Sequence, residues 1–443
     1  MPENENMPDS TTPDATTDSA TDSTPEIKVE AGAPAPENAQ ATQPKNKGRK
    51  GGEPEQPEQP KQPEQKVDPT DKPAQPARAD KADKPKAPRL THPEPVHSTP
   101  DRSETLRRVD GREMRLAVGN SHFPVEQTEA WERFEEAMGR PLWGRYLYED
   151  EGKPVAAIAL YRYEMGGQTF LWAKHGPVWL KEQSPEREAH LRRLLRSVVK
   201  ERDRSVRFIR MHARYRAADL RELLSTITYD RTYVIDLVPK TPEKIAAVMP
   251  KDGRRAVKRA ERVAREAGCT ISDETGLSRE EFDQVYEVLR ETAERDGFKP
   301  HDAEVYWTML TSLGEKNARL FVLRKDGIPH AWDLILTSGK DSVAYYGASS
   351  NESRTFRGAE ALDWWAACTL AQEGYRGLDL MGAGSTRVPS RSTVGQYKKR
   401  YAQHVTEVDG AWDVPVSRVI YSGMSAAKRL RDALRARRGS RED

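Results

Sequence analysis

Apolar residues recur along this chain with two periods, and the period changes where glycine-rich turns interrupt the sequence. Over residues 120–139 aromatic and aliphatic side chains follow helical spacing, which predicts an amphipathic helix. Residues 144–179 form short aliphatic and aromatic runs separated by glycine turns, which predicts antiparallel strands. A charged helix over residues 185–202 and a strand over residues 206–212 complete this part.

The same order of elements recurs in the second half of the chain. We expect two helices over residues 280–298 and 303–313, followed by a group of antiparallel strands over 319–350. A further helix over 358–374 and a strand over 376–382 complete the second half. The turn Gly152-Lys153-Pro154 matches Gly327-Ile328-Pro329, 175 residues later. The pattern therefore predicts two similar α+β domains packed side by side, with a candidate site in a cleft.

The first hundred residues have a different composition. They contain 19 of the 31 prolines, and the first aromatic residue of the chain is Phe123. Such a segment buries too little apolar surface to offset its ordering entropy. The sequence thus predicts a disordered arm over 1–105, then domains over 106–240 and 241–408, and a tail over 409–443.

Two segments are strongly basic. Residues 250–268 predict a helix with a cationic stripe opposite an apolar face, the stripe comprising Lys251, Arg255, Lys258, Arg262 and Arg265. The stripe is either a solvated surface or a contact for the backbone of tRNA or another polyphosphate. Residues 416–439 predict a basic amphipathic helix, which either contacts an anionic membrane or docks on the protein's own core.

Bulk properties exclude several classes of protein. The net charge of +2 does not by itself indicate a nucleic-acid-binding protein. Cys269 and Cys368 lack metal or redox spacing, which favours free thiols in a reducing compartment. We find no apolar run long enough to span a membrane and no signal-peptide pattern. We therefore expect a cytoplasmic protein, and a peripheral contact with the membrane stays open.

The sequence motifs of metal, serine-nucleophile and P-loop chemistry are missing, so we expect no metal. What remains is a group of cations and tyrosines in the second half. They are Lys398 and Arg400 between Tyr397 and Tyr401, Arg354 and Arg357 before the helix at Gly358, and Tyr345 and Tyr346 at a strand end. Such residues suit a phosphate-bearing substrate and an acyl transfer in which the protein stabilises an oxyanion.

Five motifs in order resemble the Fem (FemA/FemB/FemX) family of peptidoglycan interpeptide-bridge aminoacyltransferases. They are GPV, K-x-x-R-R-x-x-K-R-A, Y-Y-G-A-S, D-x-x-G and G-x-Y-K-K-R-Y, within residues 120–410. The resemblance implies two tandem GNAT-like domains, each a mixed sheet flanked by helices. It also implies aminoacyl-tRNA as co-substrate, no cofactor, and a lipid-linked or nucleotide-linked muramyl peptide as acceptor.

The resemblance also implies roles for single residues. The lysine of the family's F-K-x-x-F motif falls on Lys398, which we expect to be catalytic, and its flanking phenylalanines fall on tyrosines. The expected substrate-binding residues are Trp131, Lys251, Arg255, Tyr306, Tyr345, Tyr346, Arg354, Arg357, Tyr397 and Arg400.

Two positions depart from the family's pattern. Glu135 stands where some members carry a lysine, and His301 and Asp302 stand where some carry an arginine. Both changes remove a cation expected to meet the phosphates of the precursor. A lipid-linked acceptor or a shifted phosphate site therefore becomes the favoured expectation.

The predicted reaction is transfer of an amino acid from tRNA to the side-chain amine of the third stem residue (EC 2.3.2 type). The alternative is an acyl-CoA-dependent N-acyltransferase of GNAT fold, but S-R-T-F-R-G-A-E does not fit the R/Q-x-x-G-x-G/A loop that holds a pyrophosphate. A third reading is a non-enzymatic adaptor that recruits partners through its proline-rich arm.

Overall fold

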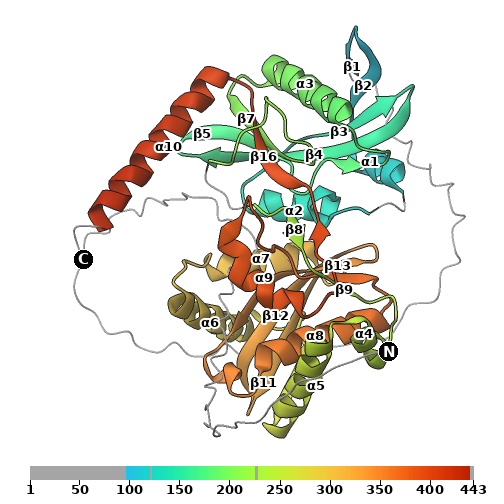
Figure 1. Cartoon of the computed structure of the whole chain (residues 1–443). Helices are drawn as coiled ribbons and strands as arrows, with labels where there is room; N and C mark the ends of the chain where they lie inside the picture. The colour runs from blue at the N-terminus through green and yellow to red at the C-terminus, as the bar shows by residue number, and fades with distance from the viewer. Residues whose placement is uncertain (1–95, 120–121, 225–227, 440–443) are drawn as a thin grey trace, which may run out of the picture.

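The computed structural model describes residues 96–119, 122–224 and 228–439, which form two sheets with helices on their faces (Figure 1). Most of the expected arm, residues 1–95, lies outside the described residues. Residues 96–105 differ from the expectation, because they form one strand and the start of a second. This hairpin completes the hydrogen bonding of the next strand and buries Leu106.

The first sheet has eight strands in the order β1-β2-β3-β4-β5-β7-β16, and β6 pairs with β4. All neighbouring strands are antiparallel except β5 and β7. The strands are β1 Val96–Thr99, β2 Arg102–Val109, β3 Leu142–Asp150, β4 Lys153–Met165, β5 Gln168–Trp172, β6 Val178–Trp179, β7 Val206–Ala213 and β16 Gly410–Pro415.

Both faces of this sheet are covered by helices. In β4, Ala157, Ala159 and Tyr161 face one core, whereas the intervening Ile158 and Leu160 face another. This alternation follows from the two-residue period of a strand. The helices on the first face are α1 Gly111–Val118 and α2 Glu129–Ala137, preceded by the short helix η1 Val125–Gln127, and α3 Pro185–Arg202 covers the second.

The second sheet has six strands in the order β10-β11-β12-β13-β14-β9. They are β9 Val234–Asp236, β10 Cys269–Asp273, β11 Ala318–Lys325, β12 Ile328–Ser338, β13 Asp341–Ser349 and β14 Gly377–Asp379. One face carries α4 Pro242–Val248, α5 Lys251–Glu266 and α8 Gly358–Gln372; the other carries α6 Arg279–Asp296 and α7 Ala303–Leu313. The remaining elements are β8 Arg231–Thr232, β15 Thr406–Glu407, η2 Glu352–Arg354, η3 Pro389–Arg391, α9 Ser392–Lys399 and α10 Arg418–Gly439.

The two domains share one hydrophobic core. A single cluster of buried residues contains Met114 and Phe134 from the first domain together with Phe282, Trp332 and Leu334 from the second. Helices α2 and α7 meet within it (Figure 1). Burial of apolar surface on both sides therefore fixes the domains against each other.

The chain crosses between the sheets twice, which moves two expected domain boundaries. Residues 234–236, expected in the first domain, form β9 and pair with β14 of the second sheet. Residues 410–415, expected in the tail, form β16 and pair with β7 of the first sheet over six positions. The physical reason is that the backbone groups of these strands need partners, and the edge of the sheet in the other domain provides them.

The tail then continues as the expected basic helix. α10 spans Arg418–Gly439 and runs along the outside of the first domain (Figure 1). Among the described residues, no helix combines the length and the hydrophobicity needed to cross a bilayer.

A buried ion pair holds β16 in the first sheet. The Arg210 guanidinium donates to both oxygens of the Asp413 carboxylate at 2.7 and 3.1 Å, and the two residues are 1% and 0% exposed. The Tyr421 hydroxyl and the backbone N–H of Leu224 also donate to this carboxylate. Burial raises the pKa of Asp413, and the Arg210 charge opposes that shift.

We predict that Asp413→Ala lowers the free energy of unfolding by about 3–5 kcal/mol, because it leaves the Arg210 charge buried without a partner. Equilibrium unfolding in urea measures the change. The control is Asp101→Ala, which removes an exposed ion pair with Arg193 and should cost about 0–1 kcal/mol. Equal losses in the two variants would show that Asp413 does not anchor the strand.

Candidate active site

The second domain contains a point where two parallel strands separate. β13 and β14 pair at Asp341–Gly377, Ser342–Leu378 and Val343–Asp379, and the chain then turns away from β13. Met381 in this turn has a left-handed backbone, with φ of 56°. A non-glycine residue in that region costs on the order of 1–3 kcal/mol and marks a constrained loop.

Lys398 holds this loop in place. Its Nζ donates to the backbone oxygens of Met381 at 2.6 Å and Gly382 at 3.1 Å. Lys398 comes from α9, which follows the loop in the chain, and its side chain is half-buried. The ammonium therefore orients two consecutive carbonyls and brings a positive charge to the point where the strands separate.

The tyrosines that flank Lys398 contact a carboxyl group. The Tyr397 hydroxyl donates to Asp363 Oδ2 of α8 at 2.6 Å and lies 2.9 Å from the Tyr401 hydroxyl. Burial raises the pKa of Asp363 to about 6. Asp333 of β12 lies beside it, and burial together with the Asp363 charge raises the pKa of Asp333 well above its usual range. The two carboxyls therefore hold at least one proton near neutral pH, since adjacent carboxylates disfavour a second charge.

Asp379 ends β14 and shapes the loop that Lys398 holds. Its carboxylate accepts from the Thr232 hydroxyl and, at 2.6 Å, from the backbone N–H of Met381. Burial raises its pKa, and these hydrogen bonds and the charges of His175 and Lys398 oppose the shift. Asp379 therefore has a structural role in this loop, and it also lies within range of the Lys398 charge.

The first domain contributes polar groups to the same junction. Glu126 of η1 is buried, and its Oε1 lies 4.0 Å from His175 Nε2. Burial raises the pKa of the Tyr345 hydroxyl well above its usual range, and the Glu126 charge adds to that shift. The His175 ring lies 5.0 Å from the ring of His212, whose pKa burial lowers to about 3. Sequence reasoning missed Glu126 and His175 because no motif connects them to Lys398.

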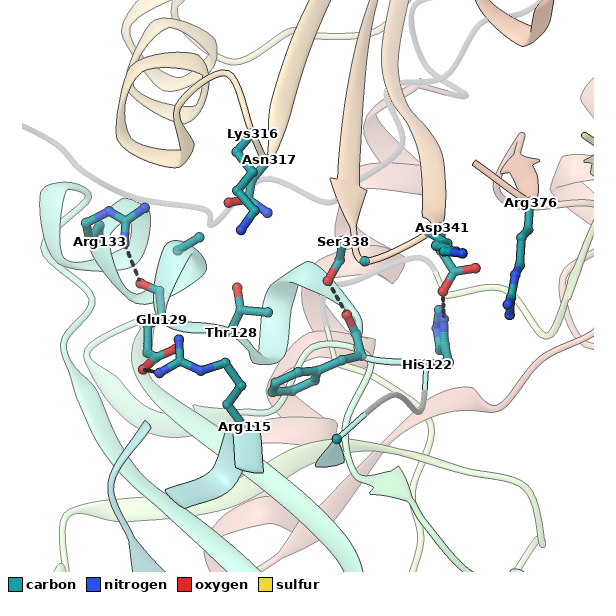
Figure 2. A pocket seen from close by; sticks show the side chains of 15 residues that line it. Arg115, His122, Thr128, Glu129, Arg133, Lys316, Asn317, Ser338, Asp341 and Arg376 are labelled. Atoms are coloured by element: carbon teal, nitrogen blue, oxygen red, sulfur yellow. Dashed lines mark hydrogen bonds and ion pairs between the residues drawn. The ribbon is translucent and has the colours of Figure 1, made fainter. Parts of the chain in front are cut away.

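A basic cleft opens between the domains (Figure 2). Its volume is about 1110 Å³, and its exposed cations are Arg115, Arg133, Lys316, Lys340 and Arg376. Two acidic residues line it: Glu129, paired with Arg115, and Asp341, whose Oδ2 lies 2.6 Å from His122 Nδ1. The hydrogen bond to Asp341 raises the pKa of His122. The excess of cations makes this cleft suitable for an anionic ligand.

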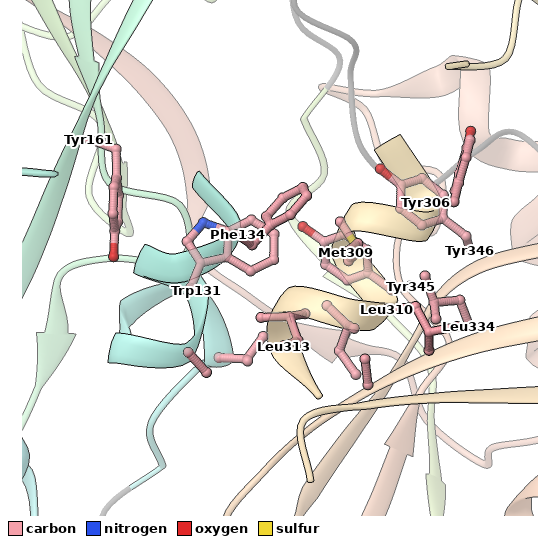
Figure 3. Packing of buried hydrophobic residues seen from close by; sticks show 14 of the residues in the cluster. Trp131, Phe134, Tyr161, Tyr306, Met309, Leu310, Leu313, Leu334, Tyr345 and Tyr346 are labelled. Carbon is pink, nitrogen blue, oxygen red and sulfur yellow. The ribbon is translucent and has the colours of Figure 1, made fainter. Parts of the chain in front are cut away.

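Four of the expected substrate-binding residues form one aromatic cluster at the domain junction (Figure 3). The ring of Trp131 lies 6.0 Å from Tyr345, Tyr345 lies 5.2 Å from Tyr346, and Tyr346 lies 4.8 Å from Tyr306. All four side chains are buried. The structure brings these residues together, and their contacts here are packing contacts between the domains.

Glu135 lies beside this cluster and has two cations, Arg140 and Lys174, as neighbours. Its fully buried carboxylate accepts from the Arg140 guanidinium and from the Tyr163 hydroxyl, and it lies 3.7 Å from Lys174 Nζ. Lys174 also sits 4.9 Å from the ring centre of Trp131. Burial lowers the pKa of Lys174. Arg140 and Lys174 lie outside the quoted motifs, so only the fold reveals them.

Two of the three expected arginines, Arg357 and Arg400, meet at the start of α8. Arg357 precedes the helix with a φ of 56° and contacts Glu360 at 2.9 Å. Arg400 contacts the same carboxylate at 3.6 Å, whereas Arg354 is exposed. The carboxylate of Glu360 therefore already occupies part of the anion-binding position that the sequence predicts here.

The expected tRNA contacts lie on α5. Lys251 and Arg255 are exposed together with the rest of the cationic stripe. The helix passes close to α9, because Gly253 faces the backbone oxygen of Arg400 at a distance that leaves no room for a Cβ. The helix that carries the basic stripe thus contacts the chain one residue beyond the end of α9.

Comparisons with known proteins agree with this architecture. Residues 251–399, which include α5 to α9, match a family described as acetyltransferase (GNAT) domain. The crystal structure of FemX superimposes with a TM-score of 0.57 at 15% sequence identity, covering 72% of this chain and 99% of that chain. No curated protein matches the sequence.

Two further solved structures align less closely. The C-terminal domain of a putative lysylphosphatidylglycerol synthetase from Agrobacterium fabrum gives a TM-score of 0.45 at 14% identity, covering 72% of this chain and 97% of that chain. L-PGS from Bacillus licheniformis gives 0.44 at 14% identity, covering 73% and 97%. The predicted fold class is confirmed: the chain has the fold of FemX, with two GNAT-like domains in tandem.

Proposed function

We propose that this protein is a tRNA-dependent aminoacyltransferase. It adds an amino acid to the stem-peptide side-chain amine of a peptidoglycan precursor and so builds an interpeptide bridge. The observation that carries the proposal is the position of Lys398, held by two loop carbonyls where β13 and β14 separate, within a chain that has the fold of FemX. The protein needs no bound cofactor in this proposal and acts in the cytoplasm.

The proposed chemistry is an acyl transfer. The amine of the third stem residue attacks the ester carbonyl of aminoacyl-tRNA, and a C–N bond forms. The ester C–O bond then breaks, and the ribose oxygen leaves with the proton that the amine loses. Lys398 stabilises the negative charge that develops on the carbonyl oxygen, which is the largest contribution a fixed cation makes in such reactions.

The cationic stripe on α5 supports a nucleic-acid donor. Its members are exposed along one side of a helix, and of these Arg262 pairs with Glu266. A row of exposed cations binds a phosphate backbone by releasing its counterions. Because Gly253 packs α5 on the chain just after Lys398, a bound tRNA would deliver its acyl end near that lysine.

The basic cleft supports an acceptor that carries phosphates. Lys316, Lys340 and Arg376 line it from the second domain, and Arg133 lines it from the first. Arg140 and Lys174 provide a second cationic position beside Trp131, where Glu135 replaces the family's lysine. We propose a lipid-linked precursor as the acceptor, with its phosphates at one of these two positions.

The second candidate is an acyl-CoA-dependent N-acyltransferase, which the match to the acetyltransferase (GNAT) family favours. The start of α8 speaks against it. Arg357 and Arg400 both contact the Glu360 carboxylate there, at the position where a glycine-rich loop would hold the pyrophosphate of CoA.

The first test is a transfer assay with purified protein and lipid-linked precursor. A bulk tRNA pool charged with labelled amino acids is the donor, with and without RNase. We expect RNase-sensitive labelling of the precursor, and the label identifies the transferred amino acid. Labelling from acyl-CoA in place of charged tRNA would overturn the proposal and support the second candidate.

Lys398→Met should lower the rate of transfer roughly 100- to 1000-fold, since one stabiliser of the oxyanion is lost. Single-turnover kinetics with saturating donor measures the change. Lys399→Met is the matched control, because Lys399 is the exposed neighbour on the same helix, and it should retain activity. A Lys398→Met protein with full activity and an unchanged melting temperature would remove Lys398 from the mechanism.

Reversing two charges of the stripe, Arg255→Glu and Lys258→Glu together, should weaken tRNA binding more than about tenfold at low salt. We also expect the slope of log affinity against log salt to fall by about 2. Filter binding at several salt concentrations measures both. Lys200→Glu, an exposed lysine on α3, is the control. If the double variant binds tRNA like the parent protein, the donor lies elsewhere.

A further inference from the structure

Helix α10 docks on the first domain along one side only of its first turns. The Tyr421 hydroxyl donates to Asp413 Oδ2 at 2.8 Å and to the backbone oxygen of Glu222 at 2.9 Å. Its ring lies 5.4 Å from Phe208, and Met424 packs against the same core. The side chains on this side of the helix therefore already have partners in the first domain.

A second apolar side of α10 is exposed. Val419, Leu430 and Leu434 are 82%, 64% and 51% exposed, and Ala426 and Ala427 between them are exposed as well. At 3.6 residues per turn these positions form one stripe, and it lies nearly opposite Tyr421 and Met424. Figure 1 shows the helix along the outside of the molecule, and the exposed fractions of these side chains leave the stripe open to solvent.

The same helix is strongly basic. Residues 418–439 contain seven Lys and Arg and a single acid, Asp432, for a net charge of +6. The cations Arg418, Arg429 and Arg431 are exposed beside the apolar stripe. An apolar stripe bordered by cations is typical of helices that lie in the interface of a bilayer.

We propose that α10 binds the surface of an anionic lipid bilayer, with Val419, Leu430 and Leu434 inserted below the headgroups and the flanking arginines on their phosphates. Two other partners fit less well. A second copy of α10 would bring two helices of +6 together, and their charges repel. An RNA backbone would neutralise the arginines but would leave the large apolar side chains in water.

This inference does not depend on the donor of the proposed reaction. It agrees with a lipid-linked acceptor, because a protein held on the membrane meets that substrate at the surface where it resides. Lipid binding and amino-acid transfer are measured separately, so that failure of one leaves the other standing.

The experiment is flotation of the full-length protein with vesicles of phosphatidylcholine alone or mixed with phosphatidylglycerol. We expect binding to the anionic vesicles that decreases as salt increases. Leu430→Asn with Leu434→Asn should weaken this binding at least about tenfold, because less apolar surface enters the bilayer. Arg429→Glu with Arg431→Glu should weaken it as well.

The matched control is Leu116→Asn, which changes an even more exposed leucine on α1 and should leave vesicle binding unchanged. Melting temperatures confirm that each variant folds. Equal binding to neutral and anionic vesicles, or parental binding by both double variants, overturns the inference. The inference also fails if the protein forms a dimer without vesicles and the leucine substitutions dissociate that dimer. It fails as well if the leucine double variant loses tRNA affinity while its vesicle binding stays unchanged.

Discussion

The architecture depends on the return of the chain to its first sheet. After leaving β7 the chain builds the whole second domain and then comes back as β16, where Arg210 clamps Asp413 out of reach of water. A buried charge pair of this kind destabilises the fold strongly when one partner is missing, so the return strand has one register in which it is satisfied. In the sequence, helix α9 lies between β14, which belongs to the second sheet, and β16, which belongs to the first. The two strands therefore restrict the position of α9 and of Lys398.

Much of this fold could be predicted from the sequence, because the apolar residues that recur with helical or strand spacing are also the residues that the structure buries. The helix expected over residues 185–202 is α3, and the helix expected over 358–374 is α8, since both carry apolar residues at helical spacing bounded by turn residues. The sequence places residues 96–105, which form β1 and the start of β2, in the disordered arm because this segment lacks aromatic residues and follows a proline-rich stretch. β2 pairs with β3, and β1 pairs in turn with β2. The pairing of β2 with β3 joins residues about 40 positions apart, and such a long-range contact leaves no local signal in the sequence.

The sequence predicts the site residues that lie close together in one segment. It does not predict the residues that come together only in the folded structure. Lys398 and its flanking tyrosines lie in one segment, whereas Asp363, Arg140 and Lys174 approach their partners only through the fold. Glu135 illustrates the difference. In the sequence, Glu135 replaces a lysine and so removes a positive charge. In the structure, its carboxylate lies beside the cations of Arg140 and Lys174. The negative charge of Glu135 offsets part of the cost of burying these two positive charges.

The departure from F-K-x-x-F then has a physical reason. A phenylalanine at position 397 would remove the hydroxyl that donates to Asp363 at 2.6 Å, and the loss of a hydrogen bond to a buried carboxyl group is costly. Tyr397, Tyr401, Asp363 and Asp333 thus form a set in which each polar group requires the others. Because two members of the set stand on either side of Lys398, the network sets the rotation of α9 and with it the direction of the ammonium group.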